Sequence, residues 1–133
     1  MNIFFLSFIF SLFIFCACRD KQATQGGSAP LTKVEWVKKN WNFGEITAGE
    51  IVSHTFFFKN TGEENFIIKN TESGCGCTTV AYDKSPLSSG KEGKIEITFN
   101  SEGRYGKQYK EISIFANVPE KKITLSFTAN VKE

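Results

Sequence analysis

The chain has 133 residues, of which 16 are basic and 14 acidic, so its formal net charge is +2. This near balance provides neither a basic surface for nucleic acid nor an acidic tail, and we expect no nucleic-acid partner. Only four cysteines and one histidine are present, which leaves few ligands for a metal.

The chain begins with an apolar run over residues 3–15, interrupted only by Ser7 and Ser11. A transmembrane helix needs about 20 apolar residues, so this run is too short to span a bilayer. Its length is typical of the hydrophobic region of a secretory signal peptide. The sequence Cys16-Ala17-Cys18 follows it, and charged residues come next.

This arrangement resembles the leader of a bacterial lipoprotein, in which the signal is cut just before a cysteine that receives lipid. Ala17 is the small residue required before that cysteine, whereas bulky Phe15 precedes Cys16, so Cys18 is the predicted lipid attachment residue. The resemblance implies a signal peptide over residues 1–17 and an acylated, palmitate-bearing N-terminus. Because two or more acyl chains anchor a protein stably, we expect a membrane-bound protein of the bacterial cell envelope, facing the periplasm or the exterior.

Two features depart from the lipoprotein pattern. Phe15 stands where the family prefers leucine, and residues 1–2 contain no lysine or arginine. The alternative is an ordinary leader cut after Ala17, but it requires a small residue in place of Phe15. We therefore favour the lipoprotein interpretation.

Residues 19–33 show no apolar periodicity, and residues 25–30 have the composition of a linker. Residues 18–33 are therefore predicted to be the lipidated cysteine and a flexible tether. Such a tether spans about 20 Å on average, so the folded body could reorient above the membrane.

Residues 34–133 carry β-strand patterns throughout. Alternating or β-branched segments predict strands over residues 51–60, 65–69, 78–82 and 94–100, another around Ile112 and Ile114, and a last one over residues 123–131. The alternation predicts these inward side chains: Ile95, Ile97 and Phe99, and in the last strand Ile123, Leu125, Phe127, Ala129 and Val131. About seven short strands with regular turns predict an all-β, immunoglobulin-like antiparallel sandwich. Trp36 and Trp41 precede the first clear strand, and we expect them to pack over a sheet end. The segment Asn60-Thr61-Gly62-Glu63 is predicted to be a turn, in which Gly62 is free to adopt a positive φ.

Several short motifs together carry a family resemblance: Asn42-Phe43-Gly44-Glu45-Ile46, Gly49-Glu50, Phe56 to Gly62 and Cys75-Gly76-Cys77-Thr78. They resemble the domain of unknown function 1573 family, whose members are bacterial, usually exported and immunoglobulin-like. The family's Pro-Gly and Ser-Asn turns are Ser89-Gly90 and Ala116-Asn117 here. The family has no established catalytic residues, so the resemblance implies none, and we predict that the protein is not an enzyme.

Cys75 and Cys77 are the only chemically distinctive cluster in this region. In an extended segment, residues two apart point to the same face, and Gly76 permits the bend that brings two sulfurs together. In an oxidising compartment a local disulfide is the favoured interpretation. Its loop is minimal, so chain entropy predicts a stabilisation of only about 1.6 kcal/mol.

A redox-active or partner-linking thiol pair is the second interpretation of this motif, and a metal site is the third. Zinc prefers four ligands, and the domain offers two thiols and His54, so copper(I) is the most plausible metal. A lone strand histidine such as His54 is usually packed against its neighbours. We therefore assign neither a metal nor another cofactor, and no catalytic residue.

Two functions follow from these patterns. The leading hypothesis is a membrane-anchored, noncatalytic interaction or structural module, held by its N-terminal lipid and bound to an envelope protein or polymer. Sandwich edges are natural docking sites for a partner's strand. The alternative is a thiol-disulfide redox or copper-handling protein that uses Cys75 and Cys77.

Overall fold

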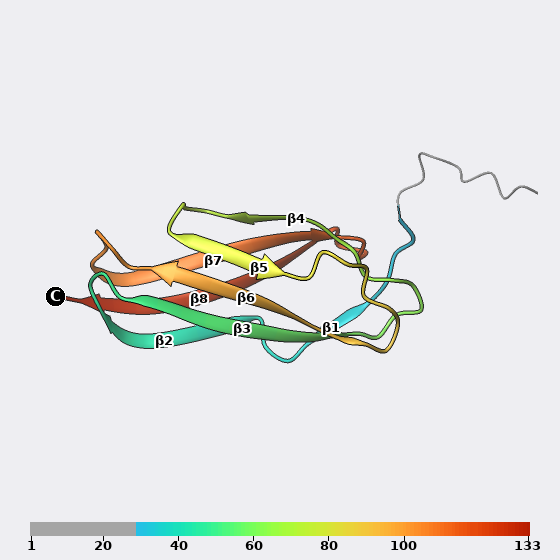
Figure 1. Ribbon diagram of the computed structural model, residues 1–133, viewed down its shortest axis with the longest axis horizontal. Helices are drawn as coiled ribbons and strands as arrows, with labels where there is room; N and C mark the ends of the chain where they lie inside the picture. Colours follow the sequence, from blue (N-terminus) through green and yellow to red (C-terminus); the bar gives the residue numbers. More distant parts are fainter. Residues whose placement is uncertain (1–28) are drawn as a thin grey trace, which may run out of the picture.

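The computed structural model describes residues 29–133, so the predicted signal peptide and Cys18 lie outside the described residues. This part of the chain contains eight β-strands and no helix (Figure 1). The strands are β1 (Val34–Trp36), β2 (Asn40–Thr47), β3 (Ile51–Asn60), β4 (Ile68–Ser73), β5 (Thr78–Tyr82), β6 (Glu92–Asn100), β7 (Gly106–Ala116) and β8 (Lys122–Lys132). No described helix is long and apolar enough to cross a membrane.

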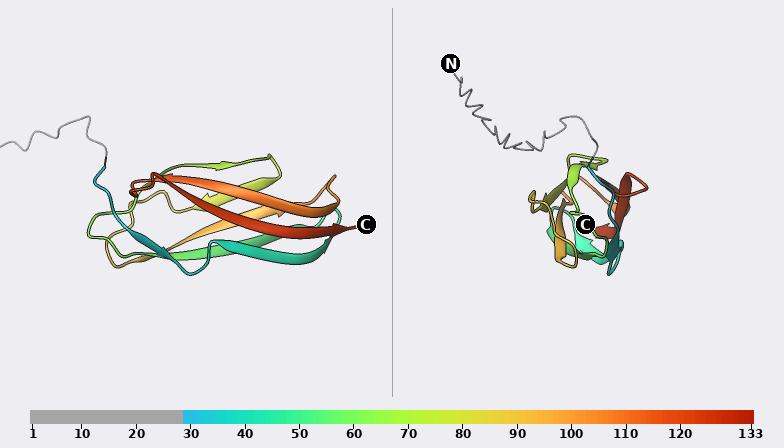
Figure 2. Two further views of the ribbon diagram at one scale, coloured as in Figure 1. Left: turned by 180° about the vertical axis from the view of Figure 1, so that it is seen from behind. Right: turned by 90° about the vertical axis from the view of Figure 1, so that its right-hand side faces the viewer.

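The strands form two four-stranded sheets that pack face to face (Figure 2). Sheet A has the order β1-β3-β6-β5, and sheet B has the order β2-β8-β7-β4. This order matches the A-B-E-D and G-F-C sheets of immunoglobulin domains, with β2 as an added edge strand. The predicted immunoglobulin-like β-sandwich is therefore confirmed.

Side chains that alternate inward from both sheets build the core. In β6 and β7, the inward isoleucines and Phe99 are fully buried, and all five predicted inward residues of β8 are buried. Phe99 from sheet A and Phe127 from sheet B meet with ring centroids 5.2 Å apart. Period-two alternation thus identified the core face of these strands correctly.

Both tryptophans lie within strands, so the expectation that they pack over a sheet end was wrong. Trp36 ends β1 in sheet A, and Trp41 belongs to β2 in sheet B. Between them the chain bends and passes from one sheet to the other without reversing direction. As a result β2 runs parallel to β8, in a sandwich that was predicted to be wholly antiparallel. The sequence did not reveal β1 because a strand of three residues is too short to show the alternation of buried and exposed side chains.

The strand predicted over residues 65–69 begins later, at Ile68. Phe66 instead makes an isolated bridge with Leu87 and is 2% exposed. Its ring meets that of Phe58 at 5.2 Å. Phe66 therefore anchors a connecting segment to the core. Its residue type alone does not distinguish such an anchor from a buried residue of a strand.

Gly62 does not use its freedom to adopt a positive φ; a glycine is required there because another segment approaches closely. A Cβ atom at this position would collide with the side chain of Thr32 and would lie 2.5 Å from the backbone nitrogen of Lys33. The absence of a side chain lets the segment that precedes β1 lie against the end of β3.

Candidate functional site

The structure joins Cys75 and Cys77 by a disulfide with a Cα–Cα distance of 5.2 Å. The pair lies in the tight connection between β4 and β5, and both cysteines are half-buried. Gly76 is exposed, its φ is not positive, and a Cβ atom there would meet nothing within 4 Å. The bend at Gly76 therefore does not depend on the absence of a side chain.

Two hydroxyl groups surround the disulfide turn. Ser73 Oγ lies 3.1 Å from the carbonyl oxygen of Cys75 and 3.0 Å from that of Thr78, and it can donate to either. Thr78 Oγ1 is 3.8 Å from both sulfurs. Since a disulfide sulfur carries no hydrogen, the threonine hydroxyl is the donor in these weak contacts. The turn is thus held by its own polar groups as well as by the sulfur bridge.

With the sulfurs joined, neither is available as a thiolate ligand for copper(I). Within residues 29–133, no group of three or more histidine, cysteine or acidic residues is placed to hold a metal ion. What the pair can do chemically in this state is thiol-disulfide exchange, in which an external thiolate attacks one sulfur.

His54 of β3 is packed between aromatic rings. It stacks on Trp41 with centroids 3.8 Å apart and meets the edge of Phe56 at 4.7 Å. Burial, together with the positive charge of Lys38, lowers the pKa of His54 below its ordinary value. This histidine therefore connects the two sheets as a neutral aromatic side chain near pH 7.

Two buried asparagines, which sequence reasoning treated as turn residues, fix the segment that precedes β1. Asn60, with no exposed surface, donates to the carbonyl oxygens of Glu64 (2.8 Å) and Leu87 (2.9 Å). Its Oδ1 atom accepts hydrogen bonds from the hydroxyl of Thr32 (2.9 Å) and from the N–H of Gly62 (3.2 Å).

Asn117 plays the corresponding part in the other sheet. Its amide donates to the carbonyl oxygens of Pro30 (2.6 Å) and Asn65 (2.8 Å) and accepts from the N–H of Ile67 (2.7 Å). Its own carbonyl accepts from the N–H of Thr32 at 2.9 Å. We call residues 30–33 the strap; its buried residue Thr32 and its backbone hydrogen bonds fix this part of the predicted linker to the folded body.

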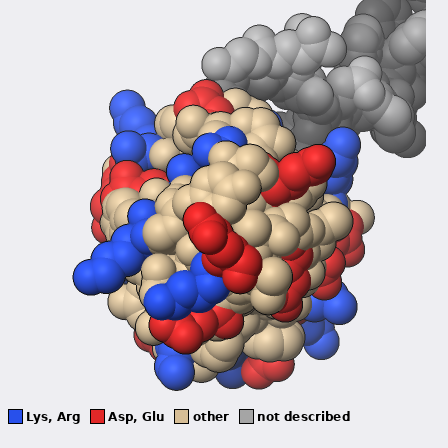
Figure 3. All heavy atoms as spheres, turned by 90° about the vertical axis from the view of Figure 1, so that its left-hand side faces the viewer, with Lys and Arg blue, Asp and Glu red and all other residues tan. Residues whose placement is uncertain are grey.

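The strap and the disulfide turn lie toward opposite ends of the sandwich (Figure 1). The strap meets Asn60 at the end of β3, whereas Cys77 is level with Asn100, which pairs with Ile51 at the start of β3. The length of β3 corresponds to a separation of about 30 Å. At the end that holds the C-terminus, acidic and basic side chains are interspersed (Figure 3).

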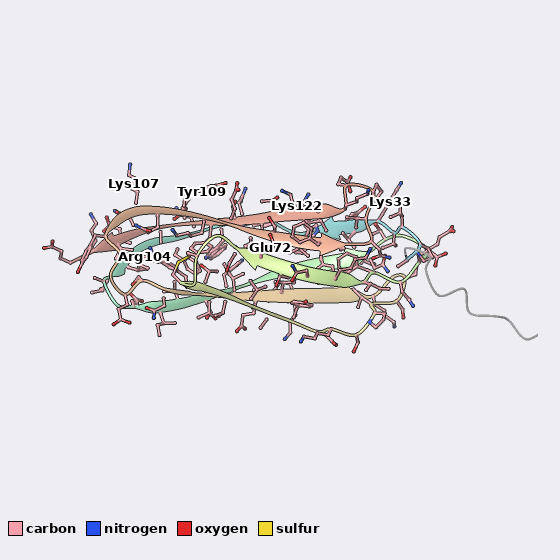
Figure 4. All side chains as sticks on the ribbon, turned by 90° about the horizontal axis from the view of Figure 1, so that it is seen from above. Lys33, Glu72, Arg104, Lys107, Tyr109 and Lys122 are labelled. Carbon is pink, nitrogen blue, oxygen red and sulfur yellow. A yellow bond between two sulfur atoms is a disulfide. The ribbon has the colours of Figure 1, made fainter. Side chains whose placement is uncertain are left out.

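The outer face of sheet B is polar. Lys107 and Tyr109 of β7 point away from the ribbon (Figure 4), and the Tyr109 hydroxyl donates to Glu111 at 2.8 Å. That hydrogen bond raises the pKa of Tyr109. Lys132 of β8 forms a salt bridge with Glu45 of β2 at 3.1 Å, with both groups largely exposed. These contacts are typical of a solvated sheet face.

Comparison with known proteins identifies the domain. The family described as "Protein of unknown function (DUF1573)" matches residues 34–131. This chain belongs to the DUF1573 family. The match covers all eight strands except the last residue of β8. No curated protein matches the sequence.

Solved structures resemble this DUF1573 domain in fold. A protein of unknown function from Porphyromonas gingivalis W83 has a TM-score of 0.67 at 17% identity, over 78% of this chain and 49% of that one. This chain therefore spans about half of that protein. The ASH/PapD-like domain 7 of human CEP192 has a TM-score of 0.64 at 15% identity, over 80% and 90% of the two chains. The E. coli chaperone DraB has a TM-score of 0.53 at 9% identity, over 78% and 57%.

Proposed function

We propose that this DUF1573 protein is a lipid-anchored, noncatalytic interaction module of the bacterial cell envelope. Lipid on Cys18 holds it to a membrane, the segment up to the strap acts as a tether, and the sandwich presents its edges to an envelope protein or polymer.

The observation that carries this proposal is the fixed position of the strap. Thr32 is 3% exposed and bonded to both Asn60 and Asn117, so the chain joins the sandwich at one defined end. A tether attached there makes the opposite end, with the disulfide turn, the part of the body that can extend farthest from the membrane. A protein that only needed to stay near a membrane would require no such fixed attachment.

Lipidation is tested by labelling cells with a palmitate analogue. The full-length protein should take up label and remain in the membrane fraction, whereas Cys18→Ala should lose both. Cys16→Ala is the matched control and should retain both. Label that persists in Cys18→Ala would refute the anchor.

Thiol-disulfide exchange at Cys75 and Cys77 is the second candidate, favoured by their bridge and by their partial exposure. In this function a partner thiolate attacks one sulfur, the other leaves as a thiolate, and a mixed disulfide forms. Titration with glutathione buffers, followed by thiol alkylation and intact mass, gives the reduction potential. A bridge that stays closed across the range of periplasmic and cytosolic potentials would exclude this candidate.

A further inference from the structure

The four sheet edges of the sandwich differ in how well they are protected from strand pairing. β1 has only three residues and includes Glu35. β2 is interrupted by a register shift around Gly44, and β4 has a register shift and exposed Lys69 and Glu72. Charges, bulges and short length are the usual devices that block an edge. β5, with the sequence Thr-Thr-Val-Ala-Tyr, has regular pairing and no charge or proline.

Hydrogen-bond alternation shows which backbone groups of β5 face its open side. The N–H of Asn100 bonds to the carbonyl of Cys77 at 2.9 Å, so this pair is a hydrogen-bonded pair of the antiparallel ladder. Alternation along β5 then directs the N–H and C=O groups of Thr78, Val80 and Tyr82 away from β6. Sheet A does not continue beyond β5 within residues 29–133.

At Thr78, the first of these three residues, the outward N–H and C=O groups are already bonded within the disulfide turn. The N–H of Thr78 bonds to the carbonyl of Cys75, and the carbonyl of Thr78 accepts from Ser73. The outward groups of Val80 and Tyr82 remain as the free part of the edge. The bridge between Cys75 and Cys77 thus holds the start of an edge strand whose later residues are open.

A depression of about 580 Å³ lies next to this edge on the outer face of sheet A. Its apolar lining includes Phe57, which is 54% exposed, together with Ala81 and Leu87. The small side chain of Ala81 leaves the depression open toward the edge. It is therefore accessible to side chains of a strand placed beside β5.

The charged lining of the same depression is mainly acidic. Asp83, Glu92 and Glu96 contribute three carboxylates, and Lys94 contributes one ammonium group. Strands in a sheet lie about 4.8 Å apart, so Glu96 on β6 is about 10 Å from a strand added to β5. A long basic side chain extended across Ala81 spans most of that distance.

We propose that β5 receives an extended basic segment of a partner protein, which adds a fifth strand to sheet A. The segment bonds to the free groups of Val80 and Tyr82 and directs alternate basic side chains toward Glu96. A second copy of this chain is a poorer occupant, because it would bring the same carboxylates to the edge. This inference names the partner class of the interaction module and rests on that proposed function.

The test uses the full-length protein in a zwitterionic detergent and a fluorescent peptide of alternating lysine and valine. We expect saturable binding that a glutamate-valine peptide does not reproduce. Ala81→Lys should weaken binding about tenfold or more by like-charge repulsion, whereas its matched control Ala81→Glu should not weaken it. Hydrogen exchange should show new protection at the amides of Val80 and Tyr82 in the complex.

Several outcomes would overturn the inference. They are equal binding of both peptides, equal effects of the two Ala81 variants, or unchanged exchange at Val80. Sedimentation that shows a dimer dissociated by Ala81→Lys would identify a second copy as the occupant instead. Palmitate labelling of Cys18 on the same preparation keeps the two proposals separate, since a labelled protein that binds no peptide refutes only the added strand.

Discussion

Two glycines illustrate, at the scale of single residues, how differently the same residue type is used. A Cβ atom at Gly93 in β6 would lie 2.5 Å from Cζ of Phe58, which is 5% exposed in the core. At Gly76, in the centre of the disulfide turn, it would meet nothing within 4 Å. Only the first glycine is required by its surroundings.

Gly93→Ala should therefore destabilise the domain by about 1–3 kcal/mol, the usual cost of overpacking a core. Gly76→Ala, the matched control, should change the free energy of unfolding by no more than about 0.5 kcal/mol. Urea unfolding followed by tryptophan fluorescence measures both. Equal effects of the two substitutions would contradict this account.

His54 makes the stability of the domain depend on pH near neutrality. Its pKa is lowered in the folded state, first by burial and then by Lys38. As the pH falls through the ordinary histidine value of about 6.5, the unfolded chain takes up a proton before the folded one does. Stability present above that pH is therefore lost on acidification.

We expect the wild-type protein to lose more stability between pH 8 and pH 5 than His54→Phe does. Phenylalanine keeps an aromatic ring against Trp41 but does not titrate. The measurement is the urea midpoint at each pH. If the two proteins lose the same stability, His54 does not titrate differently in the folded and unfolded states.

At the scale of elements, the connection from β4 in sheet B to β5 in sheet A combines a covalent bridge with hydrogen bonds. The bridge closes a loop of only three residues, from Cys75 to Cys77, and therefore restricts the unfolded chain little. The hydrogen bonds that Ser73 Oγ can donate to the carbonyl oxygens of Cys75 and Thr78 do not involve the sulfurs. The conformation of this connection should thus survive reduction.

Reduction should lower the free energy of unfolding by about 1.6 kcal/mol at most and leave the far-ultraviolet spectrum unchanged. The double variant Cys75→Ser with Cys77→Ser should match the reduced protein and should not respond to reductant. Loss of β-structure on reduction would mean that the bridge holds the fold and not only the turn.

At the scale of the whole molecule, the strap joins both sheets at one end of the sandwich. Thr32 meets Asn60 at the end of β3, and Asn117 reaches Pro30, which lies 87 residues away in the sequence. Each asparagine side chain is itself buried and bonds to three or more partly buried groups of neighbouring segments. Removing one side chain therefore leaves several of these groups unpaired.

Asn117→Ala should cost about 2–4 kcal/mol, because the N–H of Ile67 and the carbonyls of Asn65 and Pro30 lose their partners. Asn70→Ala, at an exposed position of β4, should cost no more than about 0.5 kcal/mol. Denaturant unfolding of both variants provides the comparison. A small effect at Asn117 would show that the strap contributes little to stability.

The sequence by itself determined the fold class, the core face of β6, β7 and β8, and the nearness of Cys75 to Cys77. These features depend on period-two alternation and on neighbours two residues apart, and both are local. The identity of the exposed edge was not accessible in this way, since an edge strand and a central strand can share one pattern. The sequence of β5, Thr-Thr-Val-Ala-Tyr, does not indicate by itself that the strand lies at the edge of sheet A.

Only the tertiary structure decided that the chain passes from sheet A to sheet B between Trp36 and Trp41, and that Gly62 must lack a side chain. It also decided which groups Asn60 and Asn117 bind. Each depends on contacts between distant parts of the chain. The hydrogen bond between Ile67 and Asn117, for example, joins residues 50 positions apart in the sequence. A turn asparagine and a buried asparagine have the same local sequence signal. Their difference arises only when the folded chain brings Thr32 and the segments around residues 65 and 87 against these two side chains.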